Sequence, residues 1–167
     1  GYSTATDGKM KWADATAWAA GLDVYGTTGW RLPATRDTGG AGCNWSNAGG
    51  TDCGYNVQTI SANGQTVYSE MAHMYYVTLG NLARCTPGHA SCVLQGGAGV
   101  VNSAGFEDLE WGVYWSGSTV HNPSPAAWSF GFNDGVQDGH TVPLEFYAWA
   151  VHDGDVGGAV PEPASLA

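Results

Sequence analysis

Positive charge is scarce in this chain of 167 residues, which holds five Lys and Arg against fifteen Asp and Glu and has a net charge of −10. Nucleic acids and anionic membranes bind clustered cations, so neither is expected as a partner. No run of about 18 apolar residues predicts a membrane span. Only 12% of the residues are charged, whereas eight Trp, eight Tyr and four Phe supply large apolar surfaces. This composition predicts one folded domain with an aromatic core.

Cysteine is limited to four residues, which fall in two close pairs. Cys43 and Cys53 flank a Gly-rich loop, and Cys85 and Cys92 flank TPGHAS. Pairing each cysteine with its near neighbour is the simplest of the three connectivities that four cysteines allow. Neither pair has the two-residue spacing of a zinc or redox motif, so two structural disulfides are predicted, together with a location outside a reducing cytosol.

Two segments have helical periodicity. In WADATAWAAGL, apolar residues recur at intervals of three and four, which predicts an amphipathic helix ending near Gly21. SEMAHMYYVTLGN predicts a second helix, with Ser69 as its N-cap and Gly80-Asn81 as its stop. The stretch 34–65 between them is rich in Gly, Asn and Thr. It is expected to be a surface loop stapled by the first disulfide.

The C-terminal half changes to a period of two. Trp128, Phe130 and Phe132 alternate with small or polar residues, and Asn133-Asp134-Gly135 is typical of a hairpin turn. The segment 105–155 is therefore predicted to form an antiparallel sheet, with both helices on one of its faces. The expected fold class is α+β.

Several of these segments together resemble a known domain family. They are KMKWADATAWAAGL, GWRLP, SEMAHMYYVTLGN, FEDL, VYWSGS, AWSFGFNDGVQDG and FYAWAVHDGD. They are similar to the domain named after the C-terminal region of the Legionella collagen-like protein, and Trp30, Arg31, Leu32 and Pro33 form one of the most specific matches. The resemblance implies a C-type-lectin-like fold in a secreted or surface protein, with a domain spanning 1–156. Most members of that family have no established activity.

The sequence departs from the family pattern in three places. Lys11 stands where the family often has a capping Thr, and the usual helix after the Arg-Leu-Pro step is replaced by the disulfide loop. The family's first strand, which precedes the position of Gly1, is not in this chain. An open sheet edge is expected in its place.

The tail, 157–167, resembles a second family. VPEP followed by ASLA is similar to the start of the PEP-CTERM sorting signal of Gram-negative bacteria. The motif residues are Val160, Pro161, Glu162 and Pro163. The resemblance implies export, processing by an exosortase and association with exopolysaccharide in an extracellular matrix.

Candidate metal ligands lie in the Gly-rich turns of the C-terminal half. They are Asp134, Asp138, Asp153 and Asp155. Calcium takes six to eight oxygens from flexible loops and is the one candidate ion, although solvated turn residues are the simpler interpretation. No other cofactor is predicted. The five histidines lack zinc-site spacing, so a hydrogen-bonding role is favoured for His73 over a metal ligand.

Catalytic residues are not predicted. Ser116 or Ser118 could combine with His140 and Asp138, but no strained nucleophile turn surrounds either serine. The family is related to the formylglycine-generating enzymes, whose chemistry needs a cysteine pair in the C-terminal region, and no cysteine follows Cys92. The chain is therefore expected not to be an enzyme.

One cationic and two aromatic side chains are candidates for ligand binding. For Arg31, stacking on an indole and a forked contact with a carboxylate are favoured over an anion-binding site. Trp45 and Trp111 could stack on sugars, or pack under loops or at an interface. Two functions follow: a self-associating structural matrix protein that forms filaments, and, as the alternative, a monomeric adhesin or carbohydrate-binding module.

Overall fold

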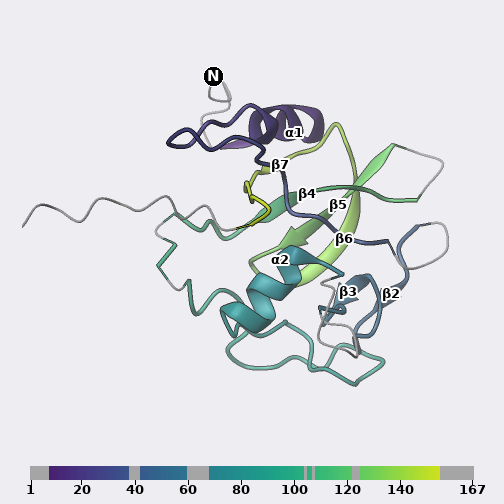
Figure 1. Ribbon diagram of the computed structural model, residues 1–167. Helices are drawn as coiled ribbons and strands as arrows, with labels where there is room; N and C mark the ends of the chain where they lie inside the picture. Colours follow the sequence, from purple (N-terminus) through teal and green to yellow (C-terminus); the bar gives the residue numbers. More distant parts are fainter. Residues whose placement is uncertain are drawn as a thin grey trace, which may run out of the picture.

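The computed structural model describes residues 8–37, 42–59, 68–103, 105–106, 108–121 and 125–154. These residues form a seven-stranded sheet, in the order β1-β7-β4-β5-β6-β3-β2, and two short helices (Figure 1). The elements are β1 (Lys9–Lys11), α1 (Trp12–Ala20), β2 (Trp45–Ser46), β3 (Cys53–Tyr55), α2 (Glu70–His73), a π-helical turn (Met74–Thr78), β4 (Val113–Thr119), β5 (Ala126–Gly131), β6 (Val136–Thr141) and β7 (Glu145–Tyr147). The predicted α+β class is confirmed. Asp155 and the tail with its VPEP motif lie outside the described residues.

Both helices occur where their sequence signals place them. α1 ends at Gly21, and Lys11 at its N-cap makes no side-chain capping bond. In α2 the Ser69 hydroxyl accepts a hydrogen bond of 3.2 Å from the backbone N–H of Ala72. The following π-helical turn stops before Gly80, which has a φ of +66°. No described helix has the length and apolar character needed to cross a bilayer.

The centre of the sheet is antiparallel, as predicted. β4, β5 and β6 pair in this way, and the 132–135 turn joins β5 to β6, with Gly135 at a φ of +74°. β7, however, runs parallel to β4, and β2 runs parallel to β3. The prediction of an antiparallel sheet over 105–155 is therefore wrong at the β4–β7 pair, because the chain after β6 passes to the far side of β4 before it forms β7. The β2–β3 pair lies in the stretch 34–65, which was predicted to be a surface loop.

Side chains of the central strands contribute to three core clusters, and each helix packs in a different one. Neighbouring residues in a strand point to opposite faces, and Tyr114 and Trp115 in β4 belong to different clusters. Tyr114 packs with residues of α2 and the π-helical turn, whereas Trp115 packs with Ala15 and Ala19 of α1. The prediction that both helices cover one face is therefore wrong, because α1 and α2 pack on side chains from opposite faces.

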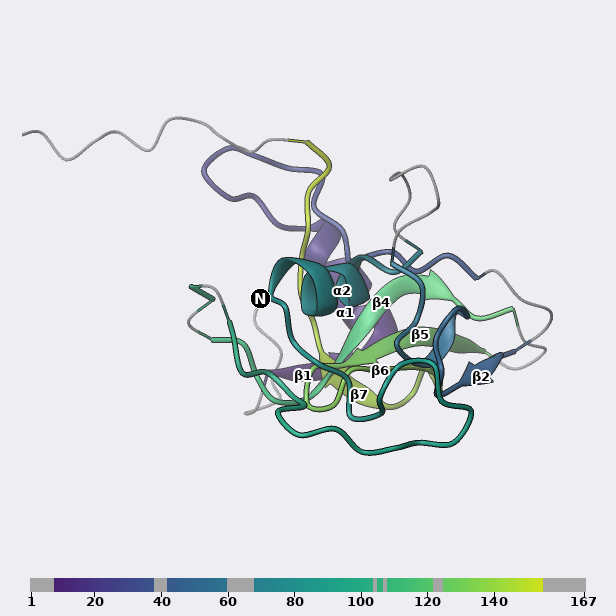
Figure 2. The same cartoon turned by 90° about the horizontal axis from the view of Figure 1, so that it is seen from below.

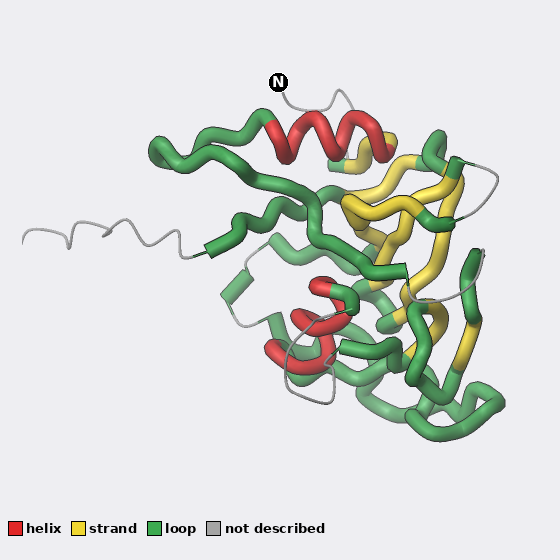
Figure 3. The backbone as a smooth tube through the Cα atoms, turned by 45° about the vertical axis from the view of Figure 1, so that its right-hand side comes forward, coloured by secondary structure: helices red, strands yellow, loops and turns green. Residues whose placement is uncertain are grey.

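Long connections make up much of the remaining chain. Figure 3 shows these connections as tubes without helix or strand on several sides of the sheet. The longest described one leads from the π-helical turn to β4, and Figure 2 shows it in teal along the lower side of the view. This connection and strand β2 carry exposed aromatic residues, namely Phe106, Trp111 and Trp45.

Candidate functional site

Arg31 lies at the centre of a network of charged groups. Its two terminal nitrogens donate to both carboxylate oxygens of Glu70 at 2.6 and 2.8 Å, and one of them also donates to Asp153 at 2.5 Å. The backbone N–H of Ala34 donates to Glu70 as well, at 2.6 Å. Arg31 thus makes the forked carboxylate contact that the sequence favoured. It joins the segment after α1, the start of α2 and the chain beyond β7.

The charged forms of Arg31, Glu70 and Asp153 stabilise one another. Hydrogen bonds to Glu70, and then to Asp153, raise the pKa of Arg31. Burial alone would raise the pKa of Glu70, but the hydrogen bonds from Arg31 and Ala34 lower it below its ordinary value. The pKa of Asp153 is lowered by its hydrogen bond from Arg31. All three groups are therefore charged at neutral pH, and the guanidinium is occupied by two carboxylates.

The rest of the Trp-Arg-Leu-Pro segment anchors the chain. The Trp30 indole donates to the carbonyl of Thr27 at 2.9 Å and packs on the ring of His152, with 5.5 Å between centroids. Leu32 is buried in the core cluster of α1. The carbonyl of Pro33 accepts a hydrogen bond of 2.9 Å from the hydroxyl of Ser116. These contacts give the motif a structural role.

Two hollows flank the Arg31 network. One of about 260 Å³ is lined by Met71, Met74 and Trp149 together with Glu70 and His73. The other, of about 190 Å³, lies between α1, the Trp-Arg-Leu-Pro segment and β4. The charged groups at the two hollows, Arg31 and Glu70, bind each other. Neither hollow brings a nucleophile together with a base.

The predicted calcium ligands do not gather into one site among the described residues. Asp153 binds Arg31. Asp134, in the turn between β5 and β6, accepts a hydrogen bond of 3.2 Å from the hydroxyl of Tyr55. Asp138 lies on β6 beside the first disulfide. Each of these three aspartates thus makes a different local contact.

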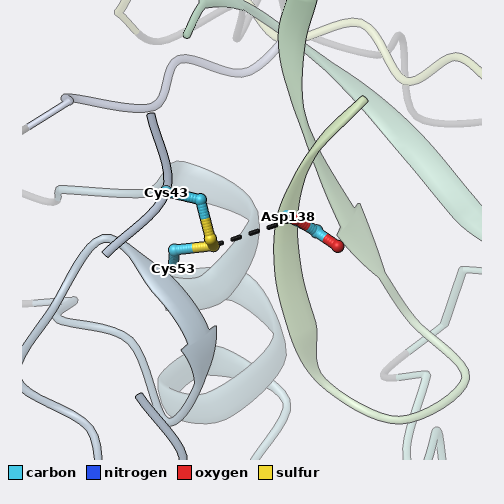
Figure 4. A group of neighbouring side chains, drawn as sticks. All are labelled: Cys43, Cys53 and Asp138. Atoms are coloured by element: carbon cyan, nitrogen blue, oxygen red, sulfur yellow. Dashed lines mark hydrogen bonds between the residues drawn. A yellow bond between two sulfur atoms is a disulfide. The ribbon is translucent and has the colours of Figure 1, made fainter. Parts of the chain in front are cut away.

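Both disulfides have the predicted pairing, Cys43 with Cys53 and Cys85 with Cys92. A carboxylate oxygen of Asp138 lies 3.9 Å from the sulfur of Cys53, and these two residues form a cluster with Cys43 (Figure 4). Because the two sulfurs are bonded to each other, neither is the thiolate that a metal needs as a ligand. The cluster is structural.

The serines that the sequence singled out have structural partners. The Ser118 hydroxyl accepts a hydrogen bond of 2.9 Å from the backbone N–H of Thr35, and Ser116 binds Pro33. His140 instead pairs with Ser129, with 2.9 Å between the hydroxyl and Nδ1. Ser129 is only 1% exposed. This cross-strand pair joins β5 to β6, and its hydroxyl is buried.

Most of the exposed apolar side chains lie in the π-helical turn and in the connection that follows it. Seven of the eleven large apolar residues exposed in the described part of the chain lie between 77 and 111: Val77, Leu82, Val93, Leu94, Val101, Phe106 and Trp111. We call them the 77–111 surface. Leu82 pairs with Gly99 through the backbone, and a Cβ atom on Gly99 would lie 3.3 Å from the ring of Trp111. Leu82 and Trp111 therefore both lie near this glycine.

No family model, curated protein or solved structure shows significant similarity to this chain. The resemblances to the Legionella collagen-like domain and to the PEP-CTERM signal therefore stay predictions from the sequence.

Two functional features were not predicted from the sequence. The carboxylate partners of Arg31, Glu70 and Asp153, are distant in sequence and have no motif in common. The 77–111 surface does have a signal, since the 27 residues 77–103 contain a single charged side chain, Arg84. A run of this length with one charged side chain is unusual for a chain with a net charge of −10, and it indicates a weakly charged segment.

Proposed function

We propose that this protein is a non-catalytic structural component of the extracellular matrix of a Gram-negative bacterium, secreted or held at the cell surface, and that its copies associate with one another. The observation that carries this proposal is the 77–111 surface. It combines strong exposure of apolar side chains with a stretch, 77–103, in which Arg84 is the one charged residue; the acidic residues of the 77–111 segment all follow that stretch.

Three side chains of this surface are mostly exposed. Leu94 is 66% exposed, Val101 68% and Trp111 64%. Contiguous exposed apolar patches mark interaction sites, because removing apolar area from water gains about 25 cal/mol per Å². Repulsion between two copies with a net charge of −10 is smallest where their charges are fewest. The 77–103 part of this surface meets both conditions, because Leu94 and Val101 are exposed there and Arg84 is its one charged residue.

The proposed extracellular location is supported by the two disulfides and by the two family resemblances. Two disulfides fit an oxidising compartment, and no described helix could span a membrane. The PEP-CTERM-like tail supports processing by an exosortase and contact with exopolysaccharide. The two helices and central antiparallel hairpins are compatible with the C-type-lectin-like fold that the resemblance implies.

The form of the assembly depends on which surface of a second copy the 77–111 surface contacts. A contact with the same surface of a second copy closes as a dimer, whereas a contact with a different surface repeats without closing and produces a filament. We propose the filament, in line with a matrix protein whose sheet has short outer strands that a neighbouring segment can extend.

The test compares two charged substitutions of exposed apolar residues. Val101→Asp alters the 77–111 surface, and Leu144→Asp alters an exposed residue in the connection between β6 and β7. Sedimentation velocity and negative-stain electron microscopy at physiological salt should show assemblies for the unmodified protein and for Leu144→Asp. Val101→Asp should sediment as the 17.3 kDa monomer.

Circular dichroism of each variant confirms that it is folded. A monomeric unmodified protein at high micromolar concentration would overturn self-association. Equal behaviour of the two variants would overturn the assignment to the 77–111 surface.

A further inference from the structure

Trp45 presents a fixed, half-exposed indole on the outermost strand β2. Its exposed fraction is 50%, and its ring meets the ring of Tyr55 edge to face, with centroids 5.9 Å apart and an interplanar angle of 85°. The indole N–H donates to the side-chain oxygen of Asn47 at 3.2 Å. Because its polar atom has a partner and one neighbour holds its ring, the rest of the ring is an apolar surface open to solvent.

The backbone beneath this indole is held rigidly. β2 pairs with β3 in parallel, and the disulfide between Cys43 and Cys53 links the chain before β2 to β3. The two strands approach so closely at Gly54 that a Cβ atom there would lie 2.1 Å from the carbonyl oxygen of Ser46. An aromatic group fixed in this way loses little conformational entropy when a ligand binds.

Polar groups lie beside the aromatic pair. The Tyr55 hydroxyl donates to Asp134 at 3.2 Å, and the second oxygen of that carboxylate accepts from the backbone N–H of Val136 at 3.3 Å. An ionised carboxylate has about four acceptor sites, so Asp134 can accept further hydrogen bonds. The amide nitrogen of Asn47 donates to the carbonyl of Ala90 at 3.1 Å, which fixes this side chain next to the indole.

We propose that Trp45, Tyr55, Asn47 and Asp134 form a binding site for a neutral polysaccharide. The C–H face of a sugar ring is apolar and slightly positive, and it matches the negative face of an indole. Sugar hydroxyls at the ring edge need acceptors, and hydrogen bonds to an ionised carboxylate are stronger than neutral ones. A polysaccharide with carboxylate or sulfate groups is disfavoured by the Asp134 charge and by the net charge of −10. This inference goes beyond self-association and uses residues outside the 77–111 surface.

Affinity electrophoresis in native gels tests the site. The gels contain dextran, a soluble β-glucan or a galactomannan as neutral chains, and alginate as an anionic chain. The unmodified protein should be retarded in at least one neutral gel and not in alginate. Trp45→Ala should bind about tenfold more weakly, and Trp45→Phe, which keeps a smaller aromatic face, should bind with intermediate strength.

Trp111→Ala is the matched control, because Trp111 is also an exposed indole but belongs to the 77–111 surface. It should keep polysaccharide binding and weaken assembly, whereas Trp45→Ala should do the reverse. The two proposals can therefore fail separately. Absence of retardation in all three neutral gels, preference for alginate, or equal losses for the two tryptophan variants would each overturn the site.

Discussion

Replacing Glu70 with Gln tests whether the Arg31 network holds the fold together. The substitution preserves the size of the side chain but removes its charge, and it turns an amide N–H₂ group toward the donors of Arg31. Glu70 accepts three hydrogen bonds, two from Arg31 and one from the backbone of Ala34. These bonds tie the segment after α1 to the start of α2, so their loss should lower the stability of the whole domain.

The expected cost is about 2 kcal/mol. Hydrogen bonds to a buried charge contribute about 1.5–3 kcal/mol each. The side chains of Arg31 and Glu70 are 35% and 34% exposed, however, so water screens the pair. We therefore assign about 1 kcal/mol to the ion pair and a similar amount to the bond from Ala34. For a domain of this size the melting temperature should fall by about 4–8 °C.

The pH dependence provides a second readout. The pKa of Glu70 is lowered in the folded protein from its ordinary value of 4.5, so its stabilising effect is complete above that pH and is lost as the pH falls through the folded value. Thermal melts followed by circular dichroism should show the full difference between Glu70→Gln and the unmodified protein at pH 7. The difference should disappear in melts at an acidic pH below the folded pKa of Glu70, where both side chains are neutral.

Glu145→Gln, which changes an exposed carboxylate on β7, is the control and should melt like the unmodified protein at both pH values. A melting temperature for Glu70→Gln within about 1 °C of the unmodified protein at pH 7 would refute the assigned magnitude. A difference that persists unchanged in acid would refute the role of the charge.

Two further predictions concern the backbone and the disulfides. Gly54→Ala should cost more than about 3 kcal/mol, because the new Cβ would lie 2.1 Å from Ser46 at a φ of +98°, while Gly50→Ala, at +82° in open space, should cost about 1 kcal/mol. Equal melting temperatures for the two variants would contradict the close approach of β2 and β3. Replacing both Cys85 and Cys92 with Ser should cost about 2.5 kcal/mol, since the bridge spans a separation of only 7 residues. Urea unfolding measures this change, and an unchanged midpoint would show that the bridge contributes nothing.

Local features of the fold were predictable from the sequence. The stop of α1 at Gly21 and the cap of α2 at Ser69 depend on a few neighbouring residues, as does the turn that ends at Gly135. The two disulfides close short loops, so sequence spacing was enough to predict them. In each case the deciding interaction lies within about ten residues of the motif.

Long-range placement was not predictable in the same way. The alternation around Tyr114 and Trp115 shows that β4 has two different faces, but it does not reveal which helix covers each face. Likewise, the aspartates in the C-terminal turns look equivalent in sequence, yet Asp153 binds an arginine more than a hundred positions earlier. Such pairings depend on the topology of the whole chain, which a local sequence pattern does not determine.

The pairing of the first described strand with the last one determines when the domain can finish folding. β1 bonds to β7, and shortly beyond β7 the backbone of Val151 exchanges hydrogen bonds with Arg31. A chain emerging from the ribosome, or crossing a membrane from its N-terminus, holds β1 and the Arg31 segment without their partners until nearly all of the domain has appeared. Contacts of this long range form slowly. The domain can therefore complete its sheet only after its last strands have emerged.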